Sequence, residues 1–124
     1  MEFELYIFNK IPGDILDGMV TLHKCIFGPD DNLINKMASK PPLLTIIAME
    51  GSKVIGYKIG YPLNRKLFYS WLGGVNPNYR NRGIASSIME KQHTYLMNSG
   101  YKIVQTKTMN KWRNMLILKH QTWV

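Results

Sequence analysis

One segment of this sequence constrains the fold more than any other. An apolar and aromatic stretch from Leu67 to Val75 ends in a turn at Asn76 and Pro77, and a short basic loop then leads directly into an amphipathic helix. The first N–H groups of a helix have no partner within the helix and lie at the positive end of its dipole, so a phosphate group can bind them. The order of strand, compact loop and helix therefore predicts an anion-binding site, with an ordinary basic turn as the alternative.

The loop has little bulk at the positions where a ligand would approach its backbone. Gly83 has no side chain, and Ala85 has only a methyl group. The segment lacks the spacing of a dinucleotide-binding G-x-G-x-x-G motif and of a G-x-x-x-x-G-K-[ST] phosphate loop, and neither motif occurs elsewhere in the chain. Hydride transfer and nucleotide hydrolysis therefore have no support from a motif.

The length of 124 residues predicts a single domain over residues 1–124, because one hydrophobic core usually serves about 100–200 residues. Hydrophobic residues make up 45% of the chain, which is enough for a packed core. The N-terminus lacks a basic, apolar leader, and no apolar run approaches the roughly 18 residues of a membrane helix. Cys25 has no second cysteine to pair with. We therefore expect a cytoplasmic protein with no membrane partner.

The chain is basic, with 16 lysine and arginine residues against 8 aspartate and glutamate residues and a net charge of +8. This charge favours anionic ligands. The basic residues are spread along the chain, so a nucleotide-type cofactor or a solvated surface explains the charge as well as a nucleic acid does. Nucleic-acid binding is therefore an alternative that only the net charge supports. Scattered histidines and one cysteine form no metal-binding pattern, and we expect no metal site.

The hydrophobic periodicity predicts an α/β fold with the order βααβββαβα. The predicted strands are 3–7, 43–49, 54–61, 67–75 and 102–108. The predicted helices are 12–27, 32–40 and 84–97, with a last helix from Trp112 almost to the C-terminus. The three middle strands are separated by short turns and should form an antiparallel meander. The strand–helix–strand unit from Leu67 to Thr108 should place its two strands parallel. The sequence therefore predicts one mixed sheet with helices packed on it.

The basic loop also fits the pattern R-x-x-G-x-A, which Arg80, Gly83 and Ala85 supply here after Val75-x-Pro77-x-Tyr79. This pattern resembles the acetyl-CoA-binding motif of the GNAT superfamily of N-acetyltransferases. The resemblance extends from about Met1 to Leu118 and implies the GNAT-like fold. It includes the order of elements and the segments 54–57 and 114–116, while 69–75 and 106–108 resemble one small bacterial subgroup.

The resemblance implies that acetyl-CoA binds as a co-substrate. In this family the pyrophosphate lies on N–H groups of the loop, and the pantetheine arm pairs with the fourth strand like an additional strand. A β-bulge splays the fourth and fifth strands apart, and Gly73-Gly74 is its expected position here, with close helix packing as the alternative. The cofactor-binding residues implied are Leu72, Gly73, Val75, Arg80, Arg82, Gly83, Ile84, Ala85, Ser86 and Ser87.

The resemblance further implies direct acetyl transfer to a primary amine of a small molecule or peptide. This reaction needs an unprotonated amine, a group that stabilises the oxyanion, and a proton for the leaving thiolate. The family often uses a glutamate on the fourth strand and a tyrosine in the last helix. This fourth strand has no carboxylate, and Lys119 stands at the tyrosine's position. The catalytic residues are unknown, with Tyr69, Lys119 and His120 as weak candidates, and a CoA-binding or regulatory module without turnover is the alternative.

The family fold continues past its last helix into a final strand pair, whereas this sequence ends at Val124, where the preceding turn should fall. We therefore expect the final strand pair to be missing and the fifth strand to keep an unpaired edge, through which two copies could form a homodimer. A frameshifted gene is a further hypothesis. The codons AAA CAT CAA ACA TGG GTT are one set that can encode residues 119–124. Reading this set one base later, with a following T, gives Asn-Ile-Lys-His-Gly-Phe. Other codons in the gene would contradict this hypothesis.

Overall fold

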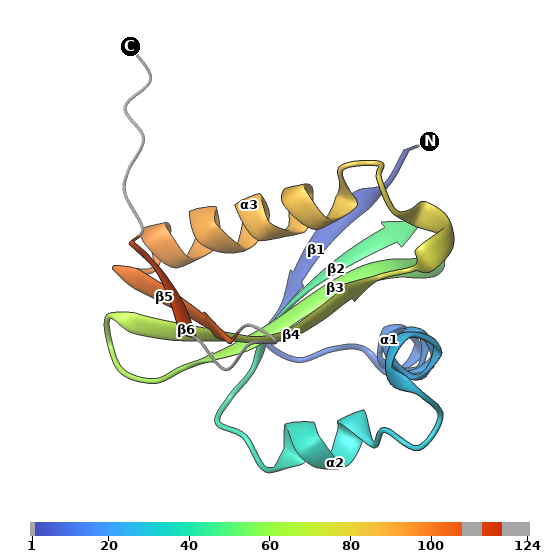
Figure 1. Ribbon diagram of the computed structural model, residues 1–124, viewed down its shortest axis with the longest axis horizontal. Helices are drawn as coiled ribbons and strands as arrows, with labels where there is room; N and C mark the ends of the chain where they lie inside the picture. Colours follow the sequence, from blue (N-terminus) through green and yellow to red (C-terminus); the bar gives the residue numbers. More distant parts are fainter. Residues whose placement is uncertain (1, 108–112, 118–124) are drawn as a thin grey trace.

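The computed structural model of the protein describes residues 2–107 and 113–117 and is built around a six-stranded mixed sheet (Figure 1). Its elements are β1 (Glu4–Phe8), α1 (Gly13–Phe27), α2 (Leu33–Ala38), β2 (Leu44–Glu50), β3 (Lys53–Pro62), β4 (Leu67–Val75), the 3-10 turn η1 (Pro77–Tyr79), α3 (Ile84–Asn98), β5 (Ile103–Lys107) and β6 (Arg113–Ile117). The helix α3 covers one face of the sheet, and α1 and α2 lie on the other face. Helices therefore cover both faces of the sheet, and the molecule has three layers.

The strands follow one another across the sheet in chain order, from β1 to β6. Neighbouring strands are antiparallel except for β4 and β5, which run parallel with Leu67 opposite Ile103 and Ser70 opposite Thr106. The helix α3 forms the connection between these two strands. The predicted meander and the predicted parallel pair are therefore both confirmed.

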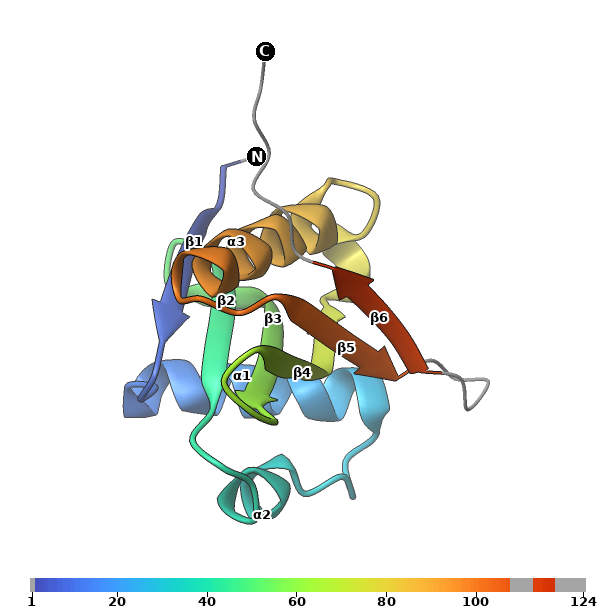
Figure 2. The ribbon, with the colours of Figure 1, turned by 90° about the vertical axis from the view of Figure 1, so that its left-hand side faces the viewer.

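Each face of the sheet buries its own hydrophobic cluster. Ile84, Ile88 and Leu96 of α3 are spaced by helical turns, and they pack on one face against strand residues such as Ile55. Met19 of α1 belongs to the second cluster, and Figure 2 shows α1 and α3 on opposite faces of the sheet. None of the helices in residues 2–107 and 113–117 is both long and apolar enough to cross a membrane. The helices are held to the sheet by these two clusters.

The helix predicted from Trp112 almost to the C-terminus is wrong at Arg113–Ile117, which form the strand β6, and the rest of it lies outside the described residues. This strand pairs antiparallel with β5, with Leu116 opposite Val104. The N–H and C=O groups along the edge of β5 need partners, and pairing with β6 supplies them. A short helix would have to form an unfavourable nucleus and would leave that edge unsatisfied. The tertiary environment therefore overrides the helical spacing of the apolar residues in this segment.

The same finding corrects the expectation of an unpaired edge on the fifth strand. The strand β5 has β4 on one side and β6 on the other. Its backbone groups are therefore engaged on both sides along most of its length. Homodimer formation through the edge of β5 consequently loses the structural basis on which it was predicted.

Candidate functional site

The strand β4 loses one of its two partners halfway along its length. It pairs with β5 only from Leu67 to Ser70, whereas its pairing with β3 continues to Val75. The register with β3 shifts between Ser70 and Leu72, so Trp71 is an additional residue and forms a β-bulge. Beyond the bulge, no strand in the described residues pairs with the edge of β4 that faces β5. The two parallel strands therefore diverge and open a wedge.

The bulge lies at Trp71, and its expected position at Gly73-Gly74 is therefore wrong. The two glycines are sites of close approach instead. A Cβ atom at Gly74 would lie 2.6 Å from Cδ1 of Ile26 in α1, and one at Gly73 would lie 3.0 Å from the carbonyl oxygen of Tyr57. The alternative of close helix packing thus applies to Gly74.

The open edge of β4 carries unpaired backbone groups. The N–H of Asn76 donates a hydrogen bond to the carbonyl of Ile55 in β3 at 2.8 Å. Alternate residues of an antiparallel strand direct their N–H and C=O groups to the same neighbour, so Gly74 also faces β3. It follows that Gly73 and Val75 direct their backbone groups to the side that β5 has left. An extended ligand could pair with this edge as an additional strand.

The loop before α3 presents further N–H groups at the same end of the wedge. Asn81 and Gly83 both have left-handed backbones, with φ values of 64° and 78°, and asparagine and glycine tolerate this conformation best. Gly83 is the N-cap of α3, no side chain caps the helix, and its first turn holds no acidic residue. The N–H of Ser87 donates to the carbonyl of Gly83 at 3.0 Å. The N–H groups of residues 84–86 therefore have no partner within the helix and can bind an anion.

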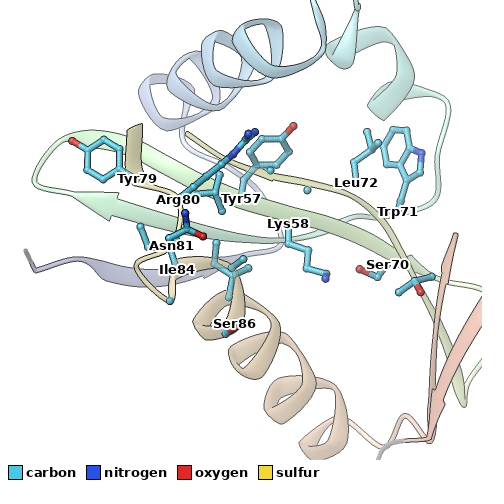
Figure 3. A pocket seen from close by; sticks show the side chains of 17 residues that line it. Tyr57, Lys58, Ser70, Trp71, Leu72, Tyr79, Arg80, Asn81, Ile84 and Ser86 are labelled. Atoms are coloured by element: carbon cyan, nitrogen blue, oxygen red, sulfur yellow. The ribbon is translucent and has the colours of Figure 1, made fainter. Parts of the chain in front are cut away.

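The wedge and the loop together form a cleft with a volume of about 650 Å³ (Figure 3). Lys58 and Ser70 lie on the α3 side of the cleft, and Tyr57 and Trp71 lie on the side of α1 and α2. The cleft therefore passes round the open edge of β4. Its lining consists of Tyr57, Lys58, Ser70, Trp71, Leu72, Gly73, Gly74, Val75, Tyr79, Arg80, Asn81, Gly83, Ile84, Ala85, Ser86, Ile88 and Thr106.

Most of the predicted cofactor-binding residues meet in this cleft. Those among its lining are Leu72, Gly73, Val75, Arg80, Gly83, Ile84, Ala85 and Ser86. Arg82 and Ser87 are not part of the lining. The guanidinium carbon of Arg82 lies 5.5 Å from the centre of the Tyr79 ring, so this side chain lies beside the loop. The binding roles of all ten residues stay predictions.

The catalytic candidates are not brought together. Tyr69 does not line the cleft, and its ring lies 5.4 Å from that of Tyr61, which also contacts Trp71 at 6.2 Å. Lys119 and His120 lie outside the described residues. The described part of the lining contains no carboxylate and no histidine. A general base is therefore not evident among these residues.

Lys58 places an ammonium group in the cleft. Its side chain leaves β3, and its amine end points toward Ser70 (Figure 3). Burial removes water from the ammonium group and lowers the pKa of Lys58. Burial and the positive charge of Lys58 together lower the pKa of His93 on α3. The deep part of the cleft is therefore basic and partly dehydrated.

Tyr57 is held in place by a buried polar network. Its hydroxyl group forms a hydrogen bond with Nδ1 of His23 at 2.5 Å, and Nε2 of His23 lies 2.9 Å from Oδ1 of Asp31. Lys36 donates to the same oxygen at 2.9 Å, and the bonds from Lys36 and His23 lower the pKa of Asp31. Burial, with a smaller contribution from the charge of Asp31, raises the pKa of Tyr57. The hydroxyl group therefore stays protonated and bound to His23.

Several lining residues were missed from the sequence. Lys58 gave a usable signal, because it is a lysine within the otherwise apolar strand pattern 54–61. Ser70 and Trp71 gave none, since their places depend on the bulge and on where β5 departs. Thr106 lines the cleft only because β5 pairs with β4 in this register.

Solved structures with similar folds come from acetyltransferases. An aminoglycoside acetyltransferase from an uncultured soil metagenomic sample, in complex with sisomicin, has a TM-score of 0.71 and 16% identity over 86% of this chain and 77% of that chain. An aminoglycoside 6'-N-acetyltransferase complexed with coenzyme A has a TM-score of 0.74 and 12% identity, with 85% and 61% of the two chains covered. The ribosomal-protein-S18-alanine N-acetyltransferase of Escherichia coli has a TM-score of 0.69 and 12% identity, with coverages of 83% and 66%.

The split parallel pair, the open edge of β4 and the uncapped helix thus define an acetyltransferase fold. A comparison with curated protein sequences gave no match. The model of the acetyltransferase (GNAT) family matches residues 18–114, and the chain therefore belongs to this family. The predicted GNAT-like α/β fold, apart from the corrected last element, and the predicted class of enzyme, an N-acetyltransferase, are confirmed.

Proposed function

We propose that the protein transfers an acetyl group from acetyl-CoA to a primary amine of a small molecule or peptide. The observation that carries this proposal is the unpaired edge of β4, which runs from the loop before α3 to the bulge at Trp71. An acetyl-CoA molecule has an anionic end and a long arm with amide groups, and this edge and loop have the complementary chemistry. Family membership supports the class of reaction.

The residues present fit both ends of the co-substrate. The N–H groups of residues 84–86 and the cationic side chain of Arg80 would bind the pyrophosphate. The backbone groups of Gly73 and Val75 would pair with the amides of the arm. The open edge from Val75 to Trp71 is about 14 Å long at the usual rise of a strand, which suits an extended arm.

The co-substrate would supply an activated thioester, and the protein would orient it. The bulge at Trp71 interrupts the regular ladder and leaves backbone groups there for a developing oxyanion. The ring of Tyr57, held through His23, lies next to Gly74 of the open edge and would keep water away from it. Direct transfer requires that the acceptor reaches the same point of the strand.

The face of β4 that lies toward α1 and α2 suits an amine acceptor. The ammonium group of Lys40 lies 5.1 Å from the ring centre of Trp71 and 5.8 Å from that of Tyr61. The rings of Trp71 and Tyr61 therefore form a cation–π site beside the bulge, which the ammonium group of Lys40 occupies here and a protonated amine could also bind. Two of the similar structures are aminoglycoside acetyltransferases, which further supports an amine-bearing small molecule as the acceptor.

One observation favours the second candidate function, a module that binds CoA with little or no turnover. The described residues that line the cleft include no carboxylate and no histidine that could take up the amine proton. Acetyl-CoA mixed with a panel of amines distinguishes the two functions. Release of free thiol that depends on an amine supports the enzyme, and binding without thiol release supports the module.

Calorimetric titration with CoA tests the shared basis of both functions. Arg80→Glu reverses a charge in the lining, and Lys91→Glu makes the same change at an exposed position of α3 outside the lining. A charge-assisted hydrogen bond contributes about 1.5–3 kcal/mol, so Arg80→Glu should weaken CoA binding by about tenfold or more. Lys91→Glu should change it far less. Absence of binding by the parent protein would contradict both functions.

A further inference from the structure

Lys58 brings a primary amine into the cleft that we assign to acetyl-CoA. It stands on β3 directly opposite Gly73 of β4. A Cβ atom at Gly73 would lie 3.5 Å from Cγ of Lys58. The aliphatic part of the lysine side chain therefore lies over β4 at Gly73, which has no side chain to obstruct it. The amine end points toward Ser70, at the point where β4 and β5 part (Figure 3). The amine therefore lies on the path of an arm that follows the open edge.

The surroundings of Lys58 make its neutral form more accessible than that of an exposed lysine. Within the described residues it forms no ion pair, because the salt bridges there involve only His23, Lys36 and Asp31. Its burial lowers the pKa of the side chain, and the neighbouring ionisable group on α3, His93, is basic as well. A partly dehydrated amine without a carboxylate partner loses its proton more readily than an exposed lysine. The neutral form is the nucleophile in acyl transfer.

From this placement we infer that Lys58 is a self-acetylation site, modified by the CoA thioester bound in the same cleft. This inference rests on the proposed binding of acetyl-CoA. The lone pair of Lys58 Nζ attacks the acyl carbon, and a C–N bond forms while the C–S bond breaks. The sulfur leaves with the electron pair of that bond and takes up the proton that the nitrogen loses. The products are an amide on Lys58 and free CoA thiol, and no oxidant or reductant is needed.

Lys53 provides a matched internal control. It stands on the same strand, but it is exposed and does not line the cleft. Its Nζ lies 5.2 Å from the centre of the Tyr79 ring. Both lysines meet the same concentration of thioester in solution, whereas only Lys58 would meet the thioester held in the cleft. Any preference for Lys58 therefore measures proximity together with the dehydration of its amine.

The experiment is incubation of the purified full chain with acetyl-CoA, without any amine acceptor, followed by peptide mass spectrometry. We expect Lys58 to gain one acetyl group at least about tenfold faster than Lys53, because a held reactant has a high effective concentration. A large excess of free CoA should suppress the acetylation of Lys58 and leave that of Lys53 unchanged. The Lys58→Arg variant should lose the fast acetylation, and its binding of CoA is measured by calorimetry in parallel.

The outcomes separate this inference from the function on which it rests. If the parent protein binds CoA but acetylates Lys58 and Lys53 at equal rates, the self-acetylation site is wrong and the proposed function stands. Acetylation of Lys58 that free CoA does not suppress would also overturn the inference, since the thioester would then come from solution. Failure of the parent to bind CoA would overturn both.

Discussion

Replacement of Gly83 by alanine isolates the backbone conformation of the loop from its packing. Gly83 has a φ of 78°, and a Cβ atom added there meets no atom within 4 Å. The expected cost is therefore only that of a left-handed backbone, about 1–2 kcal/mol for a residue with a side chain. For a domain of this length, about 1 kcal/mol corresponds to roughly 4 °C in Tm. Gly83→Ala should lower Tm by about 4–8 °C.

Gly13→Ala is the matched control for this substitution. Gly13 stands in the first turn of α1, and a Cβ atom there also meets nothing within 4 Å. In a helical conformation, alanine restricts the unfolded chain without strain in the folded one, which stabilises by about 0.4–1 kcal/mol. The same chemical change should therefore have opposite signs at the two sites. Gly83→Asn should recover part of the loss at the loop, because asparagine tolerates the left-handed region.

Thermal unfolding followed by circular dichroism and urea titration would measure these effects. The urea midpoint of Gly83→Ala should fall while the m-value stays unchanged. A Gly83→Ala protein as stable as the parent would refute the reasoning, since the loop would then not require a left-handed residue. A loss at Gly13 as large as that at Gly83 would refute it too, because packing would then be the cause at both sites.

Three further substitutions test the surroundings of the cleft. Gly60→Ala should cost about 2–3 kcal/mol by overpacking, because the new Cβ would lie 2.5 Å from the carbonyl oxygen of Tyr69. The midpoint of urea unfolding should fall accordingly, and an unchanged midpoint would contradict the packing at this site. Tyr57→Phe should cost about 1–3 kcal/mol in the same assay, because it leaves Nδ1 of buried His23 without a hydrogen-bond partner while Nε2 keeps Asp31. A loss below experimental error would argue against the hydrogen bond to Tyr57. Lys58→Met should stabilise the protein most near neutral pH. The unfolded chain binds the Lys58 proton more tightly than the folded protein does, because the folded pKa is lowered. The stability of the parent therefore rises with pH between the folded pKa and the unfolded pKa of about 10.4, and the advantage of Lys58→Met shrinks over this range. An advantage that does not depend on pH would refute this linkage.

The loop and its helix were predictable from the sequence because their determinants are local. Gly83 supplies a left-handed residue just before the apolar spacing that begins at Ile84, and the helix starts there. The strand Leu67–Val75 is recognisable from its own run of apolar and aromatic residues. Steric limits on the backbone and the period of apolar residues act within a few positions, so they can be read from the sequence alone. These rules place most of the predicted cofactor residues at one end of one strand.

The tertiary structure alone decided which segments meet and which stay apart. The segment Arg113–Ile117 has helical spacing, but the edge of β5 offers it backbone partners and makes it a strand. The bulge lies at Trp71 because the register of β4 against β3 shifts there, which no local residue preference indicated. The amine of Lys58 enters the cleft only because β5 leaves β4 after Ser70. Strand pairing and burial depend on contacts between segments far apart in the chain, and such contacts are not encoded in local periodicity.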